Sequence, residues 1–455
     1  MLEPKEIETL LIHKEWSALR GLLRELEPAD IAALLAEIPL EQLPVAFRLL
    51  PKDLAAEVFV EFDGDDQEHL IRSFTDKELR EMLDELFVDD TVDLIEEMPA
   101  VVVKRILRQT DAETRKAVNQ ILNYPKDSAG SMMTIEFVDL KQNMTASEAI
   151  ARIRAIGVDK ETVYSCYVID PNRHLLGVVS IRALLFAKDD EQVGDIMDTN
   201  IISATTLEDR EDVALKFAKY SFLALPVVDN ENRLVGIITV DDAVEVLQDE
   251  NTEDFAKMAA MTSASDENYL KTSVWRHARS RIVWLLFLML SATLTGTIIT
   301  RYETAFAAVP LLVAFIPMLM DTGGNCGSQS ATVVIRGLAL KEIEPRNILR
   351  VLWKEFRIAL MVGLLLAVVN SVRLWLMYRN QTEVSFLPLC ILLSITLMVV
   401  VILAKALGCL LPIGAKRCGL DPAIMASPLI TTIVDTCSVL VFFTLATRMM
   451  EWLIP

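Results

Sequence analysis

The feature that most constrains this chain is a series of long apolar stretches in its C-terminal part. A helix that crosses a bilayer needs about 20 mostly apolar residues to span a hydrocarbon core about 30 Å thick. Five stretches are long enough, and the second continues through a glycine-rich break: Ile282–Thr300, Ala305–Met320 extended to about Ile335, Ile358–Met377, Phe386–Leu411 and Ala426–Ala446. We therefore expect residues 271–455 to form a transmembrane domain of five helices in a lipid bilayer.

Charge is divided unevenly along the 455 residues, whose formal net charge is −20. Residues 271–455 contain 17 basic and 9 acidic side chains, whereas residues 1–270 contain 27 basic and 55 acidic side chains. The net charge of the N-terminal part is therefore −28. Such a surface argues against nucleic acid as a partner and is suited to binding cations.

Basic residues also indicate how the spans are oriented. They gather before the first predicted span, between the second and third, and between the fourth and fifth: Arg276, Arg279, Arg281, Arg336, Lys341, Arg346, Arg350, Lys354, Arg357, Lys416 and Arg417. The positive-inside rule then places residues 1–270 in the cytoplasm and, with an odd number of spans, the C-terminus outside. The N-terminus lacks the apolar core of a cleaved signal peptide, so we expect the spans themselves to direct the chain to the membrane.

Residues 1–127 are predicted to form an acidic domain of short amphipathic helices. Four segments share a plan in which a Pro, Asp or Thr and an acidic residue precede apolar residues at three- and four-residue spacing: 26–39, 50–63, 87–99 and 110–122. The leading polar residues are typical helix caps, and acidic side chains favour the first turn. Such helices cannot bury their apolar faces alone, so we expect them to stack into an α-helical superhelix.

Residues 128–246 contain an internal repeat. The segments 168–181 (VIDPNRHLLGVVSI) and 227–240 (VVDNENRLVGIITV) align without gaps at an offset of 59 residues. Each predicts a strand, a polar turn, a glycine and a second strand, and each is preceded and followed by an amphipathic helix. This duplicated unit resembles a tandem pair of CBS domains, an α/β regulatory module, and the resemblance does not identify a ligand.

Residues 247–270 link this module to the first predicted span. The segment is acidic and contains the run QDENTEDFAKM. We interpret it as an acidic helix that leads towards the membrane.

Asp435 is placed near the middle of the fifth predicted span, with no charged neighbour in the sequence. A charged side chain at that depth costs about 2.5–3.5 kcal/mol on insertion scales, so it must face a water-filled path, a partner or a cation. The alternative is a protonated carboxyl group that is hydrogen-bonded between helices. Thr431 lies one turn earlier, so its hydroxyl or carbonyl would line the same face.

The second predicted span combines helix-interrupting residues with polar ones. Pro310 and Pro317 precede a polar, glycine-rich run: Asp321, Gly323, Gly324, Asn325, Gly327 and Gln329. Interrupted backbone at membrane depth is tolerated where it is buried or lines a cavity, which favours a functional site here. The alternative is glycine-mediated helix packing. Asp421, which precedes the fifth span, would either cap a helix or bind a cation.

The candidate site offers oxygen donors from carboxylate, amide, hydroxyl and carbonyl groups. No histidine or thiol cluster accompanies them, and oxygen-only sets suit Mg²⁺ or Ca²⁺ better than copper or zinc. Because Mg²⁺ gives up its water reluctantly, a sparse site with one carboxylate per subunit fits hydrated Mg²⁺. The sequence contains no nucleophile elbow, P-loop or HExxH motif, so an enzyme is disfavoured.

The order of these parts, together with two motifs, resembles the MgtE family of bacterial magnesium channels. The motifs are PMLMDTGGNCGSQSATVVIRGLA at 317–339 and DPAIMASPLITTIVD at 421–435. The resemblance implies a homodimer in the bacterial cytoplasmic membrane with a central pore. It implies that Asp435 binds hydrated Mg²⁺ and that Thr431 contributes a carbonyl. It also implies that Gly324 and Asn325 line the pore, to which we add Asp321 as a candidate.

The resemblance further implies regulation by cytosolic Mg²⁺. Residues 247–270 would form a plug helix under the pore, and Mg²⁺ bound between acidic faces of the N domain, the CBS domains and this helix would hold the pore closed. The matching acidic residues are Asp89, Asp90, Asp93, Asp241, Asp242, Glu250, Glu253 and Asp254, and Asp421 is a further candidate metal ligand. Acidic surfaces that repel each other at low Mg²⁺ and are bridged at high Mg²⁺ give such a switch a physical basis.

The resulting hypothesis is an Mg²⁺-selective channel or transporter that imports Mg²⁺ and is closed by cytosolic Mg²⁺. One alternative is a CBS-regulated transporter of another divalent cation, such as Co²⁺. A second is a membrane sensor without ion flux, against which the intramembrane Asp435 argues. Binding of an adenine nucleotide to the CBS pair is also compatible with the resemblance.

Overall fold

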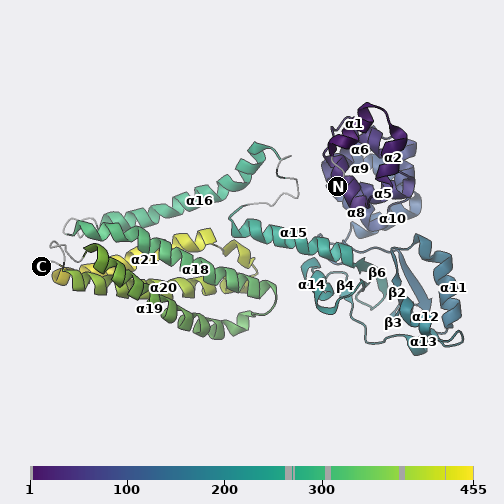
Figure 1. Cartoon of the computed structure of the whole chain (residues 1–455). Coiled ribbons are helices and arrows are strands. Elements are labelled where there is room, and N and C mark those ends of the chain that lie inside the picture. The colour runs from purple at the N-terminus through teal and green to yellow at the C-terminus, as the bar shows by residue number, and fades with distance from the viewer. Residues whose placement is uncertain are drawn as a thin grey trace. The chain divides into compact units, whose positions relative to one another are not determined.

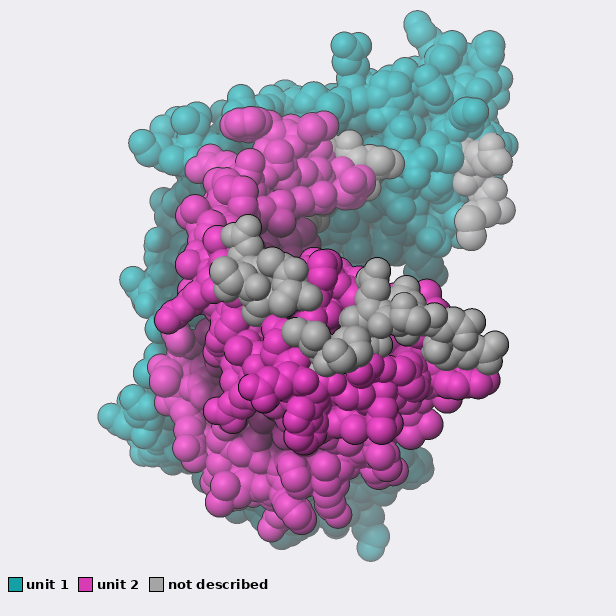
Figure 2. All heavy atoms as spheres, turned by 90° about the vertical axis from the view of Figure 1, so that its left-hand side faces the viewer, with its two compact units in different colours: residues 1–248 teal, residues 249–455 magenta. Residues whose placement is uncertain are grey.

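The computed structural model describes residues 4–261, 269, 272–302, 309–378, 385–425 and 427–453. The chain divides into two compact units, residues 1–248 and residues 249–455, which are teal and magenta in Figure 2. Helix α15 (Val240–Met258) is continuous from the first unit into the second (Figure 1).

Short helices form the N-terminal part of the first unit. They are α1 (Pro4–Ile12), α2 (Trp16–Leu23), α3 (Pro28–Ala36), α4 (Leu43–Phe47), α5 (Lys52–Val60), α6 (Gly64–Ser73), α7 (Asp76–Leu83), α8 (Val88–Glu97), α9 (Ala100–Gln109) and α10 (Ala112–Ile121). The four predicted segments coincide with α3, α5, α8 and α10. Asp111 caps α10 by accepting hydrogen bonds from the backbone N–H groups of Glu113 and Thr114, as its position predicts.

The internal repeat folds into two three-stranded sheets. The strands are β1 (Phe137–Lys141), β2 (Thr162–Ile169) and β3 (Leu175–Ser180), then β4 (Ala204–Thr205), β5 (Ala224–Val228) and β6 (Leu234–Thr239). In each sheet the first strand pairs parallel with the second and the second antiparallel with the third. The accompanying helices are α11 (Ala146–Ile156), η1 (Gly157–Asp159), α12 (Ile181–Phe186), α13 (Val193–Ile196) and α14 (Arg210–Tyr220).

The two hairpin turns confirm the 59-residue repeat, because equivalent residues make equivalent hydrogen bonds in both turns. The carboxylate of Asp170 accepts from the backbone N–H of His174 at 2.8 Å, and that of Asp229 accepts from the N–H of Arg233 at 2.9 Å. The residue before each donor has a left-handed backbone, with φ of 69° at Arg173 and 61° at Asn232. The predicted tandem α/β module is therefore confirmed. Its second sheet shares one apolar core with the N-terminal helices, including Phe59, Ile71 and Ile238.

The second unit is helical in its described residues. Beyond the end of α15 it contains α16 (Val274–Arg301), η2 (Pro310–Phe315), α18 (Ile316–Ala339), η3 (Pro345–Asn347), α19 (Ile348–Tyr378), α20 (Phe386–Arg417), η4 (Pro422–Met425), α21 (Ser427–Arg448) and α22 (Met450–Leu453). In the described residues, four segments are long and apolar enough to cross a membrane: Val274–Arg301, Pro345–Tyr378, Phe386–Arg417 and Pro422–Arg448. They correspond to the first, third, fourth and fifth predicted spans.

The predicted glycine-rich break in the second span is wrong. Helix α18 runs without interruption through Gly323, Gly324 and Gly327. Pro310 begins η2, and Pro317 lies in the first turn of α18, where a missing N–H leaves no hydrogen bond unmade. Residues 303–308 of this span lie outside the described residues. Because its sequence is polar, α18 is not among the four apolar segments, and the count of five spans stays a prediction.

The predicted linker helix covers residues 247–270, of which 262–268 and 270 lie outside the described residues. The helix itself starts earlier, at Val240, directly after strand β6. Met258 at its end packs against the apolar cluster of the second unit that contains Cys326, Ala423 and Ile430. The last turns of α15 are thus attached to the helical bundle.

Candidate functional site

Helix α21 carries Asp435 in a partly enclosed position. The side chain is half-buried, and its Oδ1 atom is shielded from solvent without a hydrogen-bond partner among the described residues. A shielded carboxylate oxygen that lacks a partner is costly and calls for a water or a cation. Asp321 of α18 is near enough for the two carboxylates to repel each other. This pair of acidic groups therefore favours a bound cation between α18 and α21.

Thr431 lies one turn before Asp435 and faces α18. Its hydroxyl donates to the carbonyl oxygen of Ser427 at 2.7 Å and lies 3.5 Å from the hydroxyl of Ser328. Gly324 of α18 packs on it, because a Cβ atom at Gly324 would stand 2.8 Å from Cγ2 of Thr431. The absence of a side chain at Gly324 lets the two helices approach each other here. The structure thus brings Thr431 and Gly324, both selected by the sequence analysis, into contact one turn before Asp435.

One face of α18 is polar and exposed in the single chain. Asp321, Asn325, Gln329 and Thr332 lie at spacings of three or four residues, which places them on one side of the helix. Asn325 donates from Nδ2 to Oδ1 of Asp321 at 3.1 Å. A polar stripe on a bundle whose other exposed helices are apolar cannot face lipid, since exposed polar groups are expensive there. It must face water or another protein surface.

Asp421 is bonded to groups of its own chain. Its Oδ1 accepts from the backbone N–H of Ala423 at 2.8 Å, which is the capping role. Its Oδ2 accepts from Nζ of Lys257 at 2.6 Å, and Lys257 also contacts Oε1 of Glu253 at 2.7 Å. Burial lowers the pKa of Lys257, but its bonds to Asp421 and Glu253 outweigh that effect and hold the pKa above its usual value. A lysine ammonium thus occupies the place where a cation was predicted.

A second acidic group lies in the first unit. Helix α8 contributes Asp89, Asp90 and Asp93, and the start of α15 contributes Asp241 and Asp242. Asp93, whose side chain is exposed, lies near Asp242, and burial raises the pKa of Asp242 to about 7. Burial and Asp242 also raise the pKa of Asp89 well above its usual range. These predicted residues are therefore gathered into one region where like charges interact.

Two glutamates from the first sheet join this group, and the sequence analysis missed both. Glu136 precedes β1 and accepts from the backbone N–H of Val88 at 3.0 Å. Glu161 precedes β2, and burial raises its pKa to about 8, with Asp90 as the next cause. Oδ1 of Asp89 and Oε2 of Glu161 are shielded and have no hydrogen-bond partner among the described residues. We name these residues the acidic cluster: Asp89, Asp90, Asp93, Glu136, Glu161, Asp241 and Asp242.

No set of three or more His, Cys, Asp or Glu side chains within the described ranges is already arranged to hold a metal ion. The carboxylate oxygens of the acidic cluster nevertheless fit a hard, hydrated cation, because such an ion binds through its water shell. The other predicted sensor residues, Glu250, Glu253 and Asp254, lie in the second unit, roughly three turns further along α15.

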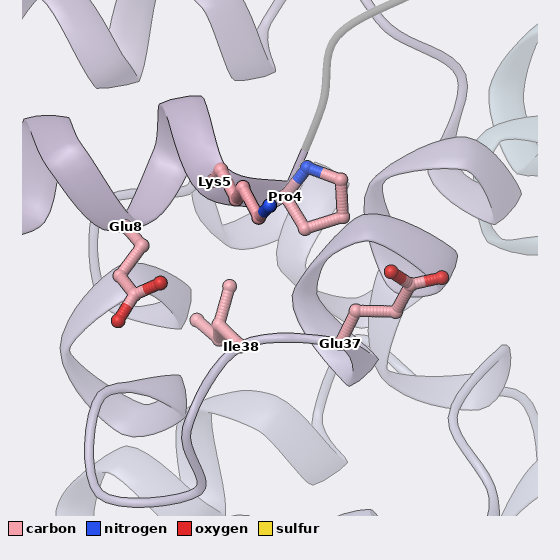
Figure 3. Close-up of a pocket in the computed structure, with 5 residues that line it drawn as sticks. All are labelled: Pro4, Lys5, Glu8, Glu37 and Ile38. Atoms are coloured by element: carbon pink, nitrogen blue, oxygen red, sulfur yellow. The ribbon is translucent and has the colours of Figure 1, made fainter.

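A hollow of about 310 Å³ lies between α1 and the end of α3, lined by Pro4, Lys5, Glu8, Glu37 and Ile38 (Figure 3). It contains none of the predicted site residues. We assign it no part in the site.

Three family profiles match consecutive parts of the chain. The MgtE intracellular N domain matches residues 26–127, and the CBS domain matches residues 129–190 and 193–249. MgtE, described as a divalent cation transporter, matches residues 316–445. The magnesium transporter MgtE of Thermus thermophilus is 35% identical over 438 residues, which cover 95% of each chain.

The chain belongs to the MgtE family. The magnesium transporter MgtE of Bacillus subtilis is 33% identical over 428 residues, covering 94% of this chain and 93% of the relative. The crystal structure of the cytosolic domain of the Mg²⁺ channel MgtE in complex with ATP is 37% identical, with a TM-score of 0.51, and covers 53% of this chain and 99% of that chain. The crystal structure of the soluble part of a magnesium transporter is 28% identical with the same TM-score and covers 54% of this chain and 97% of that chain.

Membership in the MgtE family confirms several predictions. The N domain and the CBS pair precede a helical C-terminal region that is apolar enough for a membrane. MgtE relatives are named as magnesium transporters and not as enzymes, so the chain is a member of a transporter family with CBS regulatory domains.

Proposed function

We propose that this chain is an Mg²⁺-selective channel or transporter that imports Mg²⁺ across the bacterial cytoplasmic membrane. The observation that carries the proposal is Asp435, whose shielded Oδ1 lacks a partner among the described residues and whose carboxylate is repelled by Asp321. A cation between them would relieve both costs. The carboxyl, amide and hydroxyl oxygens nearby suit a hydrated Mg²⁺. In this proposal Asp435, Thr431, Asn325, Gly324 and Asp321 form the pore.

The polar stripe on α18 supports a homodimer. A single chain leaves Asp321 and Asn325 exposed on a helix that must be shielded from lipid. A second copy related by a two-fold axis would place the same stripe opposite itself and enclose a polar path. The proposal includes five spans, with α18 as the second, residues 1–270 in the cytoplasm and the C-terminus outside. It keeps the boundaries 1–127, 128–246, 247–270 and 271–455, with a superhelical N domain.

The acidic cluster supports regulation by cytosolic Mg²⁺. Its carboxylates lie close enough to interact, Asp89 is buried, and two oxygens of the cluster lack partners among the described residues. Bound Mg²⁺ would offset the repulsion, and α15 would transmit the change as a plug helix, since it is continuous from Asp241 and Asp242 to Glu253 and Asp254. A ligand that binds one state better shifts the population towards it. We propose that high cytosolic Mg²⁺ favours the closed state in this way, with Glu250 as a further contributor.

A flux assay tests the proposal. The full-length protein in liposomes should carry Mg²⁺, and Asp435→Ala should abolish uptake, while Glu451→Ala, which removes an exposed carboxylate at the C-terminal end, should leave uptake unchanged. Normal uptake by Asp435→Ala would contradict the pore assignment. Because the family is described as divalent cation transporters, a panel with Co²⁺ and Ca²⁺ separates Mg²⁺ selectivity from transport of another divalent cation. Absence of flux for every ion would favour a sensor.

A nucleotide at the CBS pair is a further part of the proposal. A cytosolic domain that is 37% identical was solved in complex with ATP. We expect the full chain to bind ATP, with a dissociation constant that calorimetry can measure. Calorimetry with ATP and with GTP would test this, and no heat of binding for either nucleotide would contradict it.

A further inference from the structure

A charged pair is buried inside the helical bundle, away from the residues assigned to the pore. Glu355 of α19 and Lys405 of α20 are 9% and 5% exposed, and Ser330 of α18 is 2% exposed. The Ser330 hydroxyl donates to Oε2 of Glu355 at 2.7 Å and accepts from Nζ of Lys405 at 3.1 Å. Nζ of Lys405 lies 3.5 Å from the same carboxylate oxygen. One polar triad therefore joins three helices.

The triad lies where the backbones of α18 and α20 approach each other closely. A Cβ atom at Gly408 of α20 would clash with the carbonyl oxygen of Gly327 and stand 3.1 Å from Cβ of Ser330. On its other side, α18 packs against α21, since a Cβ atom at Gly327 would stand 2.8 Å from Cγ2 of Ile430. Helix α18 is thus enclosed between two neighbours with little side-chain bulk of its own.

Close packing through small residues does not by itself fix the rotation and axial position of α18 against its neighbours. Small residues let helix backbones approach closely, but the smooth surface that they leave does not select one rotation or one axial position. A buried ion pair with a hydroxyl group does select one, because a displaced charge would lose its partner in an apolar interior. Ser330 is five residues from Asn325, or roughly 7.5 Å along the axis. The same helix presents Ser328 to Ser427 and Thr431.

We propose that Glu355 and Lys405, acting through Ser330, are positioning residues that hold α18 in the register required by the ion path. The inference rests on the proposed function, because it assigns the triad to the same pore. None of the three side chains contacts the ion. They act by fixing where Asp321, Asn325 and Gly324 lie against α21.

The first experiment measures helix register without any ion flux. Ser328→Cys and Ser427→Cys introduce thiols at positions whose hydroxyl oxygens lie 2.9 Å apart, and disulfide formation between them is quantified by mass spectrometry of the linked peptides. We expect the added substitution Lys405→Met or Glu355→Gln to slow this cross-link. The exchanged pair Glu355→Lys with Lys405→Glu should restore it, because the Ser330 hydroxyl can reverse its donor and acceptor roles. Lys354→Met, an exposed neighbour of Glu355, should have no effect.

The second experiment measures transport by the full-length protein without added cysteines. Uptake of Mg²⁺ per folded molecule should fall roughly tenfold or more in the single variants, because small misplacements of functional groups have large effects on rate. The ratio of Co²⁺ to Mg²⁺ uptake should rise, which a loss of folded protein alone would not produce. The exchanged pair should recover both quantities in part, and Lys354→Met should again match the unmodified protein.

The outcomes separate the two proposals. Unchanged cross-linking and an unchanged ion ratio in folded single variants would overturn the positioning role, as would an exchanged pair that is no better than the single variants. If the single variants do not fold, Ser330→Ala, which removes only the bridging hydroxyl, carries the same expectations. Absence of Mg²⁺ flux in the unmodified protein would contradict the proposed function, and the cross-linking experiment would still decide whether the triad sets helix register.

Discussion

Nζ of Lys257 lies 2.6 Å from Oδ2 of Asp421, which joins the last turn of α15 to the segment that enters α21. The two residues are 164 positions apart in the sequence. Asp254, also near Asp421, has a pKa raised by burial and by that carboxylate. The ammonium of Lys257 therefore compensates acidic groups at this junction.

We predict that Lys257→Met weakens the attachment of α15 to the bundle. Partly exposed ion pairs contribute about 1 kcal/mol or less, which corresponds to a change of up to about fivefold in an equilibrium. Uptake of Mg²⁺ into liposomes without Mg²⁺ on the cytoplasmic side should rise, because Glu253, Asp254 and Asp421 then repel one another. Lys354→Met is the matched control. A variant with lower uptake under these conditions would contradict the prediction.

The close approach of α18 to α21 predicts that Gly324→Ala impairs transport. The new Cβ atom would stand 2.8 Å from Cγ2 of Thr431, and overpacking of this kind typically costs about 1–3 kcal/mol. The unfolding temperature and the Mg²⁺ uptake rate should both fall. Gly296→Ala in α16 is the control, since a Cβ atom there would have no heavy atom within 4 Å among the described residues. Equal effects of the two substitutions would show that the contact with Thr431 does not matter.

The acidic cluster predicts an inverse dependence of stability on pH in the absence of divalent cations. Glu161 and Asp242 have pKa values raised by burial to about 8 and 7, above those of the unfolded chain. The folded state then binds more protons than the unfolded state between about pH 4 and 8, so stability falls as the pH rises through this window. Thermal unfolding of residues 1–261 in a chelator should show a higher midpoint at pH 5 than at pH 8.

Mg²⁺ should reverse this trend, because it replaces the missing protons. Its addition at pH 8 should raise the midpoint by at least about 3 °C, which corresponds to about 1 kcal/mol for a domain of this size. A midpoint that increases with pH in the chelator would refute the assignment of repulsion to the cluster.

Glu161→Gln tests a member of the cluster that the sequence analysis missed. Removal of one partly buried charge should raise the midpoint of thermal unfolding in the chelator at pH 8 and reduce the increase in midpoint that Mg²⁺ produces. Asp159→Asn, a change at an exposed residue two positions away, should alter neither quantity. Loss of stability in the chelator on Glu161→Gln would mean that the carboxylate is held by a favourable bond and not by repulsion.

Local patterns in the sequence were sufficient for much of the architecture. The apolar periodicity in residues 26–122 predicts α3, α5, α8 and α10, because it depends on neighbours three and four positions apart. The repeat at 59 residues predicts two equivalent sheets. Long apolar runs predict the four hydrophobic segments. The same reasoning about intramembrane charge that selected Asp435 applies to Lys405, which lies within the predicted span Phe386–Leu411, and would have found it.

Only the tertiary structure decided which positions far apart in the chain are in contact. The sequence by itself placed Asp421 and Asp435 as cation candidates, since an acidic residue in an unusual context is visible locally, and the family resemblance added Asp89. It could not predict that Glu136 and Glu161 join Asp89, that Lys257 pairs with Asp421, or that Ser330 links Glu355 and Lys405. It also predicted a break at Gly323 and Gly324, where the packing of α21 and α20 on both sides of α18 keeps the helix continuous. The physical reason is the same in each case: charge pairing and close packing depend on distance in space, which periodicity along the chain does not encode.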